Sequence, residues 1–237
     1  MFLSVIIPAY NEEKRLPKTL KKVKEYLSTQ KYEWEVLIVN DGSIDGTFKV
    51  SSDLIKDWKN FQLINNEENQ GKGAVVKQGM LEAKGDWRLF MDADGSTDIL
   101  EIEKLWPYIK DFEIVIGSRY LNKDSIKIKQ PITRRIVSRL GNFLVRILLG
   151  IKSVDTQCGF KLFSTKATEK IFPLQQIIRW GFDVEILAIA IKKGYKIKEV
   201  AVDWHDAEGS TVRKSAIFKT LKELMQIKWN MVKGKYQ

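Results

Sequence analysis

Two aspartates, Asp92 and Asp94, stand one residue apart directly after the apolar run Trp87–Met91. Carboxylates at this spacing repel each other, and a bound divalent cation removes the repulsion. Mg²⁺ and Mn²⁺ prefer oxygen ligands, and Mg²⁺ usually takes one or two carboxylates and fills its shell with water and substrate phosphate. The pair therefore predicts a metal that Asp94 contacts and that bridges a diphosphate. In a purely structural alternative, Asp94 and Gly95 form a turn and Asp98 caps the next helix.

The elements that must position this pair alternate between short apolar runs and helical patterns. The expected strands are Leu3–Pro8, Glu35–Val39, Phe61–Asn65, Trp87–Met91 and Ile114–Gly117. The expected helices are Lys18–Thr29, Thr47–Trp58, Gly73–Ala83 and Ile99–Trp106. This alternation predicts an α/β fold with a mostly parallel central sheet that helices cover on both faces.

Polar segments follow four of the expected strands, at Pro8–Glu13, Asn40–Ser43, Asp92–Asp94 and Gly117–Arg119. Each has an ordinary explanation when taken alone, because Asp-Gly-Ser is a common turn and Asn-Glu-Glu can begin a helix. In open sheets of this kind, however, ligands bind beyond the carboxyl ends of the strands. The shared position therefore predicts one polar site at a single edge of the sheet.

The glycine-rich stretch Asn69–Gly73 does not match either common phosphate-binding motif. It lacks the GxxxxGK[ST] spacing of a nucleotide-hydrolase loop, and Val76 stands where GxGxxG needs its last glycine. We expect Gly71 and Gly73 to allow a tight entry into the next helix, with Lys72 facing either the site or solvent.

The chain has 237 residues and a net charge of +10, which implies an anionic partner such as nucleic acid, a membrane surface or a phosphorylated substrate. A nucleic-acid-binding protein would not need the gathered acidic groups. The single cysteine, Cys158, cannot form an intramolecular disulfide, so we expect a reducing compartment and a packing role. The N-terminus has no leader pattern, and no run reaches the roughly 18 apolar residues of a membrane span.

The polar segments carry a family resemblance. The stretches PAYNEE at 8–13, NDGSIDGT at 40–47, QGKG at 70–73, DADGS at 92–96 and GSR at 117–119 resemble family 2 glycosyltransferases with a GT-A fold. In the second half, DTQCGFKLF at 155–163, RWGFDVE at 179–185 and VDWHDAEGS at 202–210 resemble dolichyl- or polyprenyl-phosphate β-glucosyltransferases. The similarity to dolichyl-phosphate mannose synthases is weaker.

The resemblance implies a donor site and a metal. The implied nucleotide-sugar-binding residues are Pro8, Tyr10, Glu12, Asp41, Lys72, Asp92, Ala93, Asp94 and Lys214. Asp92 and Asp94 correspond to the family's DxD pair and would hold Mg²⁺ or Mn²⁺, with Asp94 as the main ligand. Asp92 either assists the metal or accepts a hydrogen bond from a sugar hydroxyl.

The implied catalytic residues are Asp94, Asp183, Arg119 and Arg213. Arg119 would lie near the acceptor or sugar phosphates, and Asp183 near the reacting sugar. The alternative for Asp183 is a helix N-cap. Arg213 or Lys214 would close over the diphosphate, although relatives have a lysine where this chain has Thr211. His205 could approach the diphosphate or the metal, or make ordinary hydrogen bonds.

Residues 123–152 carry a basic amphipathic pattern. Arg135, Arg139 and Arg146 fall on one helical face, and apolar side chains fall on another. Such a helix can lie in a lipid interface, or it can pack on the protein core with its basic face in water. The stretch 216–232 is also amphipathic and could extend the same surface or cover the sheet. Trp180 could stack on a sugar or an isoprenoid, or belong to the core.

The resemblance, together with these features, implies one GT-A domain, with a nucleotide-sugar-binding half at 1–119 and an acceptor-binding, membrane-facing half at 120–237. The expected activity is inverting, metal-assisted transfer of a hexose, with glucose from UDP-glucose as the first candidate, to dolichyl or polyprenyl phosphate. The expected location is the cytoplasmic face of a membrane, as a peripheral protein. The alternatives are a mannosyltransferase that uses GDP-mannose, a glycosyltransferase with a non-lipid acceptor, and a non-catalytic relative, which the intact Asp92 and Asp94 disfavour.

Overall fold

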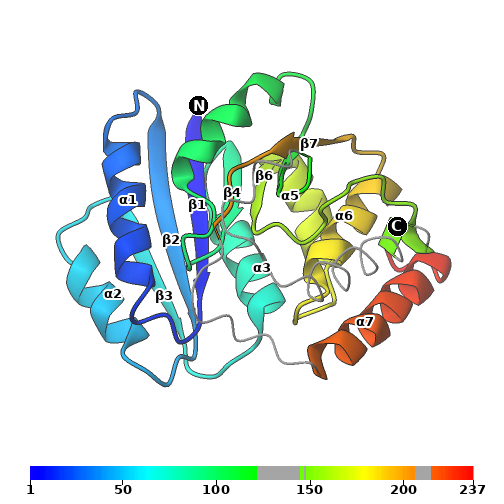
Figure 1. Cartoon of the computed structure of the whole chain (residues 1–237), viewed down its shortest axis with the longest axis horizontal. Helices are drawn as coiled ribbons and strands as arrows, with labels where there is room; N and C mark the ends of the chain where they lie inside the picture. The colour runs from blue at the N-terminus through cyan, green and yellow to red at the C-terminus, as the bar shows by residue number, and fades with distance from the viewer. Residues whose placement is uncertain (122–144, 147, 206–214, 237) are drawn as a thin grey trace.

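The computed structural model describes residues 1–121, 145–146, 148–205 and 215–236 (Figure 1). In this part of the chain, seven strands form one sheet in the order β3-β2-β1-β4-β6-β5-β7. Their bounds are Phe2–Ala9 (β1), Glu33–Asp41 (β2), Phe61–Asn66 (β3), Trp87–Met91 (β4), Ile114–Ser118 (β5), Phe160–Ser164 (β6) and Ile197–Ala201 (β7). Strand β6 is antiparallel to its neighbours β4 and β5, and the other neighbouring pairs are parallel. The predicted mostly parallel sheet is confirmed.

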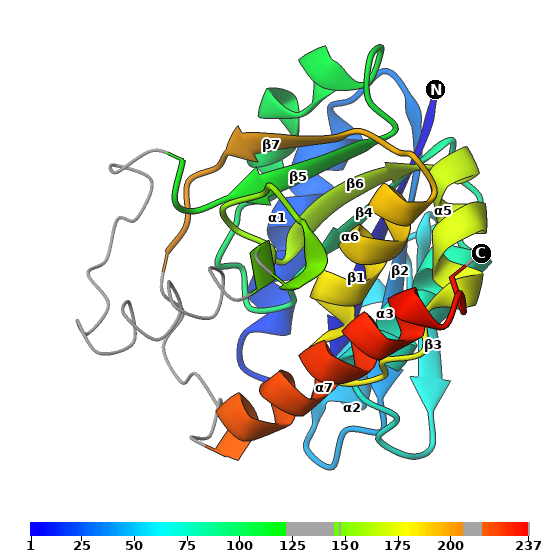
Figure 2. The same cartoon turned by 90° about the vertical axis from the view of Figure 1, so that its right-hand side faces the viewer.

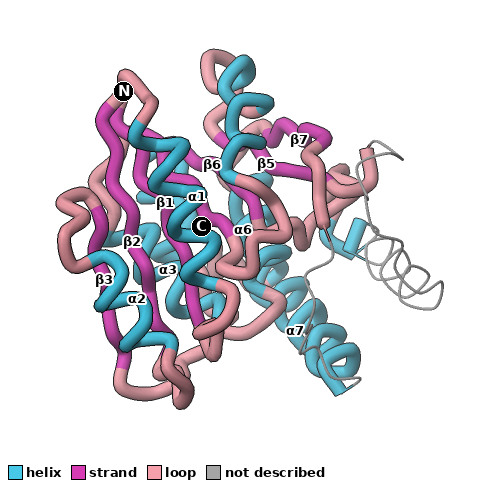
Figure 3. Tube along the Cα trace, turned by 60° about the vertical axis from the view of Figure 1, so that its left-hand side comes forward, coloured by secondary structure: helices cyan, strands magenta, loops and turns pink. Residues whose placement is uncertain are grey.

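Helices cover both faces of this sheet. They are α1 (Leu16–Ser28), α2 (Thr47–Ile55), α3 (Lys72–Glu82), α5 (Thr165–Ile171), α6 (Phe182–Lys192) and α7 (Ser215–Val232), with short 3₁₀ helices η1 (Ile99–Lys104), η2 (Trp106–Tyr108) and η4 (Phe172–Leu174). Helices α1 and α2 lie on one side of the sheet and α3 on the other (Figure 1 and Figure 3). Figure 2 shows α7 beside α6 on the α3 side.

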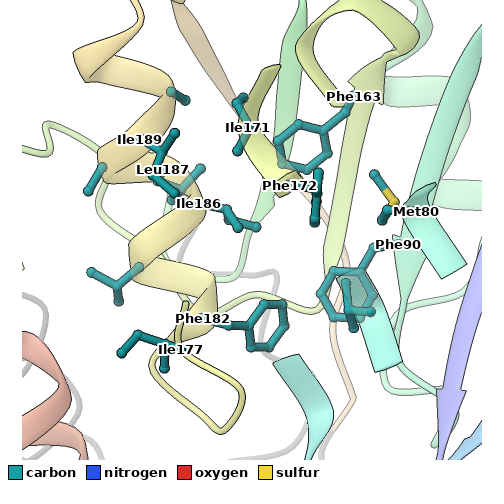
Figure 4. Packing of buried hydrophobic residues seen from close by; sticks show 14 of the residues in the cluster. Met80, Phe90, Phe163, Ile171, Phe172, Ile177, Phe182, Ile186, Leu187 and Ile189 are labelled. Atoms are coloured by element: carbon teal, nitrogen blue, oxygen red, sulfur yellow. The ribbon is translucent and has the colours of Figure 1, made fainter. Parts of the chain in front are cut away.

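The core is divided into two apolar layers because successive side chains of a strand point to opposite faces. In β1, Val5 and Ile7 belong to the layer under α1, and Ile6 belongs to the layer under α3. In the second layer, which Figure 4 shows from close by, the rings of Phe90 and Phe182 meet edge to face with centroids 5.7 Å apart. This contact joins β4 to the start of α6 at the end of the sheet where the predicted site lies.

The five predicted strands are all present, and Trp87–Met91 has the predicted bounds. The predicted helix Ile99–Trp106 is instead two short 3₁₀ helices, the second of which contains Pro107 in its first turn. Proline has no amide hydrogen, so it ends a hydrogen-bonded helix that runs into it. Strands β6 and β7 were not predicted from the sequence. Lysine interrupts the apolar run of β6, and the pattern of β7 is short and mixed.

Candidate active site

The first two polar segments are joined by hydrogen bonds at the carboxyl edge of the sheet. Asn11 has a positive φ of 56°, and its side chain accepts a hydrogen bond from the Ile44 amide at 3.0 Å. The Asn11 amide donates to Ser43 Oγ at 3.0 Å, and the Glu12 amide donates to Thr47 Oγ1 at 2.7 Å. The loops after β1 and β2 are therefore held against each other.

Glu12 lies in the electrostatic field of the aspartate pair. Arg15 Nε is 2.6 Å from Glu12 Oε2, so the two side chains form an ion pair. Burial raises the pKa of Glu12 above its ordinary value, Arg15 opposes this rise, and the charges of Asp94 and Asp92 add to it. The loop after β1 therefore lies close enough to the loop after β4 for their carboxylates to influence one another.

Asp41 fastens the loop that leads into α3. Its side chain is 2% exposed and accepts hydrogen bonds from the amides of Gln70 at 2.7 Å and Gly71 at 3.0 Å, and from Asn69 Nδ2 at 3.0 Å. Burial raises the pKa of Asp41 although these backbone amides lower it. The Asp41 carboxylate therefore holds the loop at 69–71 in place.

Lys72 faces the aspartates. It is the first residue of α3, and its Nζ lies 2.6 Å from Asp92 Oδ1 and 5.4 Å from the ring centroids of Phe90 and Trp180. Burial alone would lower the pKa of Lys72, but the charges of Asp92 and Asp183 hold it above its ordinary value. The sequence left open whether Lys72 meets the site or solvent, and the structure places it in the site.

The segment 175–181 braces the start of α3. Gln175 Nε2 donates to the Gly73 carbonyl at 2.8 Å. A Cβ atom on Gly71, whose φ is 103°, would lie 2.5 Å from the Ile178 carbonyl oxygen. Only glycine fits where two backbones approach this closely. The tight helix entry expected from the glycines is confirmed, and its physical reason is this neighbouring segment.

Glu185 on α6 connects this segment to the last described residues. Its Oε2 accepts hydrogen bonds from the amides of Gln176 at 3.0 Å and Ile177 at 2.7 Å, and its Oε1 accepts one from the Tyr236 hydroxyl at 2.6 Å. Tyr236 is fully buried, and Asn230 Nδ2 donates to its hydroxyl at 3.2 Å. The residues after α7 thus support the segment that braces the site.

Gly159 supplies the space that the Asp92 carboxylate occupies. A Cβ atom on Gly159 would lie 2.0 Å from Asp92 Oδ2, far inside van der Waals contact. The Asp92 amide also donates to the Gly159 carbonyl at 3.0 Å. Next to it, Ala93 is buried, and its carbonyl accepts a hydrogen bond from Thr19 Oγ1 at 2.8 Å. The loop that carries Asp92 and Asp94, called the aspartate loop below, is therefore held by Gly159 on one side and by Thr19 on the other.

The turn proposed as the structural alternative is present together with the acidic pair. Asp94 Oδ1 accepts a hydrogen bond from the Ser96 amide at 2.9 Å, and Gly95 has a φ of 70°. Asp98 accepts a hydrogen bond from the Leu100 amide at the start of η1. The turn fixes the backbone that presents the Asp94 carboxylate, so the structural and chemical interpretations are compatible.

The carboxylates suit a divalent cation. Burial, and then the charge of Asp92, raises the pKa of Asp94, so the protein holds negative charge there at a cost that a cation would relieve. Asp92 Oδ1 is buried and accepts no hydrogen bond of ordinary geometry, although Lys72 Nζ is 2.6 Å away. No group of three or more His, Cys, Asp or Glu side chains gathers as a metal site among the described residues. Two carboxylates fit a Mg²⁺-type ion that takes its remaining ligands from water and phosphate.

Asp183 lies in the first turn of α6 and is 4% exposed. It does not cap the helix, because Gly181 holds the N-cap position, so the capping alternative is wrong. Its Oδ1 accepts a hydrogen bond from Lys161 Nζ at 2.5 Å, and the same Nζ donates to the Cys158 carbonyl at 2.6 Å. Lys161 was not predicted as a site residue, and the signal that could have found it is a lysine in the middle of an apolar strand. The Cys158 side chain is buried, in agreement with a packing role.

Arg119 is bound to Asp155, which the sequence analysis also missed. Its Nε and Nη2 donate to the two oxygens of Asp155 at 2.7 and 2.8 Å, and its amide donates to Oδ2 at 3.0 Å. The Arg119 guanidinium also lies 5.2 Å from the Tyr120 ring and 5.5 Å from the Trp204 ring. Arg119 is thus held rigidly beyond the carboxyl end of β5.

The remaining described candidates lie around this centre. Pro8 is buried in β1, and Tyr10 exposes 43% of its surface just after the strand. Trp180 is 46% exposed above Lys72, so it is not a core residue. The His205 amide donates to the Ser96 carbonyl at 2.8 Å, which brings the segment after β7 to the aspartate loop.

The basic candidates fall mostly outside the described residues. Arg213, Lys214, Arg135 and Arg139 are among the residues that the structure does not describe, and Arg146 is described and exposed. Among the described helices, none combines the length and the apolar character needed to cross a bilayer.

Comparison with protein families and with known sequences finds similarity to glycosyltransferases in both cases. The family model described as "Glycosyl transferase family 2" matches residues 4–172. A dolichyl-phosphate beta-glucosyltransferase of Trichomonas vaginalis is 40% identical over 96% of this chain and 73% of its own length. The enzymes of that name from Saccharomyces cerevisiae and Homo sapiens are 36% and 37% identical, over 100% and 88% of this chain and 77% and 68% of their own lengths.

Solved structures share the fold at low identity. A glucosyl-3-phosphoglycerate synthase from Mycobacterium tuberculosis, crystallised with Mn²⁺, UDP-glucose and glycerol 3-phosphate, has a TM-score of 0.70 at 16% identity, over 95% of this chain and 78% of that one. A mannosyl-3-phosphoglycerate synthase from Rubrobacter xylanophilus has a TM-score of 0.73 at 13% identity, over 99% of this chain and 75% of that one.

Proposed function

Because the chain belongs to glycosyl transferase family 2, we propose that it transfers a hexose, with glucose from UDP-glucose as the first candidate, to dolichyl or polyprenyl phosphate. The observation that carries this proposal is the pair Asp92 and Asp94, presented beside Lys72 at the carboxyl edge of the sheet. The names of relatives at 36–40% identity support glucose as the sugar and dolichyl phosphate as the acceptor, and a solved structure of the same fold contains UDP-glucose.

The proposed donor site follows the loops at this edge. Pro8, Tyr10 and Glu12 are assigned to the nucleotide, and Asp41 supports the neighbouring loop that leads to Lys72. Ala93 holds the backbone between Asp92 and Asp94 through its bond to Thr19. Lys214 is assigned to the same site from the sequence alone.

A divalent cation is proposed at Asp94, with Asp92 either assisting or accepting a hydrogen bond from a sugar hydroxyl. The charge and burial of the two carboxylates fit such an ion, and Mn²⁺ is present in a solved structure of the same fold. When bound, the cation would supply Lewis-acid stabilisation of the diphosphate leaving group. The proposed ion is Mg²⁺ or Mn²⁺.

The chain's own side chains then divide the remaining work. Lys72 places a fixed positive charge beside the aspartates, and Arg213 is the proposed cation that closes over the diphosphate. The acceptor phosphate is already ionised at neutral pH, so no strong general base is needed. Asp183 orients a sugar hydroxyl or stabilises the positive charge that develops on the sugar ring. Arg119 is assigned to the acceptor or sugar phosphates. Attack from the face opposite the leaving group inverts the anomeric centre and gives a β-linked product.

The proposal divides the single domain into a donor half, residues 1–119, and an acceptor half, residues 120–237, that faces a membrane. The net charge of +10 and the basic pattern of Arg135, Arg139 and Arg146 support a peripheral position at the cytoplasmic surface.

The test is a donor screen with polyprenyl phosphate, with and without EDTA. We expect lipid-linked hexose that depends on the metal, and a loss of product of about 100-fold or more in Asp94→Ala, since removing one preorganised electrostatic contact typically costs that much. Asp98→Ala is the matched control, because this aspartate caps η1 and is not assigned to the site. Product only from GDP-mannose, or only with water-soluble acceptors, would select one of the alternative activities, and full turnover in Asp94→Ala would refute its assigned role.

A further inference from the structure

Lys161 is an unusual residue for its position. It lies in the middle of β6, between β4 and β5, and its side chain is fully buried. Burying a charge costs several kcal/mol even when it is paired, and replacing a buried ion pair by apolar side chains is often neutral or stabilising. Fold stability alone therefore gives no reason for a lysine here.

The partner of Lys161 is an acidic residue of the site. Lys161 Nζ contacts Asp183 Oδ1 at 2.5 Å and the Cys158 carbonyl at 2.6 Å. Its side chain has no solvent exposure, whereas that of Asp183 keeps 6%. Lys161 Nζ thus contacts a backbone carbonyl and the Asp183 carboxylate and does not reach solvent.

Four elements determine the charge around Asp183. Lys161 approaches from β6 and Lys72 from α3, and both favour the carboxylate form. Asp92, after β4, opposes it. Asp183 also stands in the first turn of α6, where the helix N-terminus favours negative charge. Burial is the largest influence, and it leaves the pKa of Asp183 above its ordinary value despite the two lysines.

We propose that Lys161 is a positioning residue that keeps the buried Asp183 carboxylate ionised and oriented toward the reacting sugar. Without Lys161, burial and Asp92 would favour a protonated Asp183. A neutral carboxyl group neither stabilises positive charge on the sugar ring nor accepts hydrogen bonds as strongly. This inference rests on the proposed function of the site, and it assigns Lys161 no contact with substrate.

The experiment compares Lys161→Gln and Lys161→Met with Asp183→Asn in the full chain, using kcat measured from pH 6 to 9.5. Lys72 and the helix N-terminus remain near Asp183 when Lys161 is removed, but the lysine that touches the carboxylate no longer opposes burial, so the pKa of Asp183 should rise further. We expect kcat of both lysine variants to fall roughly 10- to 100-fold at pH 7 and to recover by about tenfold per pH unit until Asp183 is ionised. Asp183→Asn should stay low at every pH, and Lys161→Gln/Asp183→Asn should be no slower than Asp183→Asn alone. Lys166→Gln, an exposed lysine at the start of α5, is the control and should match the unmodified protein.

A second readout does not require turnover. The ¹³Cγ shift of Asp183, assigned by its loss in Asp183→Asn, reports its protonation directly. We expect its titration to move up by about 2 pH units or more in Lys161→Gln. An unchanged titration, a pH-independent loss of kcat in the folded variant, or additive effects in the double variant would overturn the inference. If the unmodified protein makes no product from any donor, the proposed function fails, and the ¹³C titration still decides the role of Lys161. Lys161→Gln keeps a hydrogen-bond donor, so it serves if Lys161→Met does not fold.

Discussion

At the scale of single residues, Gly159 and Asp92 occupy a space that admits only one side chain. The Cβ position of Gly159 overlaps the Asp92 carboxylate, and the backbone groups of the two residues are hydrogen-bonded. The position of the first aspartate therefore depends on a missing side chain on the neighbouring strand segment.

Gly159→Ala should move the Asp92 carboxylate and impair the reaction more than the fold. A displacement of about 1 Å at a reacting centre can cost about 100-fold in rate, so we expect a loss of that order in kcat/KM for the sugar nucleotide. Gly150→Ala is the control, because its Cβ meets nothing within 4 Å while its φ of 70° makes the substitution strained. It should lower stability by about 1 kcal/mol and keep activity. Equal activities in the two variants would contradict this account.

Asp155 and Arg119 form a buried pair whose contribution to stability depends on pH. Burial alone would raise the pKa of Asp155, but the Arg119 guanidinium holds it below its ordinary value. A lowered folded-state pKa means that the pair stabilises the protein above the unfolded pKa of about 3.9 and that this stability is lost as pH falls through the folded value.

Asp155→Asn should therefore lower the free energy of unfolding at pH 7 by about 3–5 kcal/mol, as expected when one partner of a buried ion pair is removed. Urea unfolding measured from pH 7 downward should show the two proteins converging below about pH 4. Asp53→Asn, which removes a solvent-exposed pair with Lys49, should leave the unfolding curve unchanged. A pH-independent difference would show that the charge of Asp155 is not what matters.

The sequence predicted only part of which residues form the site and what they contact. Asp92, Asp94 and Lys72 stand beside strand ends or glycines, so their place at the sheet edge follows from spacing and sheet topology. Lys161 and Asp155 come from the second half of the chain, and their partners are 22 and 36 residues away in sequence. Such pairings depend on tertiary packing, which local patterns do not contain. Asp41 was expected to line the nucleotide pocket, and its hydrogen bonds to the loop at 69–71 could not be read from a turn motif.

At the scale of elements, segment 175–181 links α6, α7 and the start of α3. Glu185 holds the segment through two backbone amides, and Tyr236 holds Glu185 from the far side. The loop at 69–71 and the start of α3 are therefore supported by residues about 160 positions later in the chain, a coupling that no sequence pattern indicates.

Tyr236→Phe should weaken this support without removing the ring. The lost hydrogen bond to a carboxylate is worth about 1–3 kcal/mol, so we expect a corresponding loss of stability in urea and a raised KM for the sugar nucleotide. Tyr195→Phe is the matched control, because the Tyr195 hydroxyl makes a 3.3 Å bond to the exposed Lys166 carbonyl. A lower stability with unchanged KM would limit the role of Tyr236 to folding.

Helices and strands were easier to predict than side-chain contacts. Buried strands give largely apolar runs, which made β1, β2, β4 and β5 predictable, and the edge strand β3 was also found although it is only partly buried. Strand β6 escaped prediction because a functional candidate, Lys161, interrupts its pattern. The prediction of one helix at 99–106 was wrong because the chain forms two short 3₁₀ helices there, and Pro107 lies in the first turn of the second.

At the scale of the whole molecule, the excess of positive charge should control contact with membranes. We expect binding to anionic vesicles that weakens as salt rises, and binding about tenfold or more weaker in Arg135→Glu/Arg139→Glu, since each basic residue near such a surface contributes about 1 kcal/mol. Lys18→Glu/Lys21→Glu on α1 makes the same change in net charge at an exposed place outside the proposed surface. Equal losses in vesicle sedimentation for both variants would leave only a general charge effect and remove the proposed membrane face.

Strand β6 has a consequence for how the chain can be assembled. It inserts between β4 and β5, two strands that precede it by more than 40 residues, so β5 and β7 cannot join the sheet until β6 has been made. A nascent chain that has left the ribosome only as far as β5 would expose the unpaired edge of β4, a template for pairing with other chains. Fragments cut between the two halves should therefore aggregate separately and regain solubility only when they are refolded together.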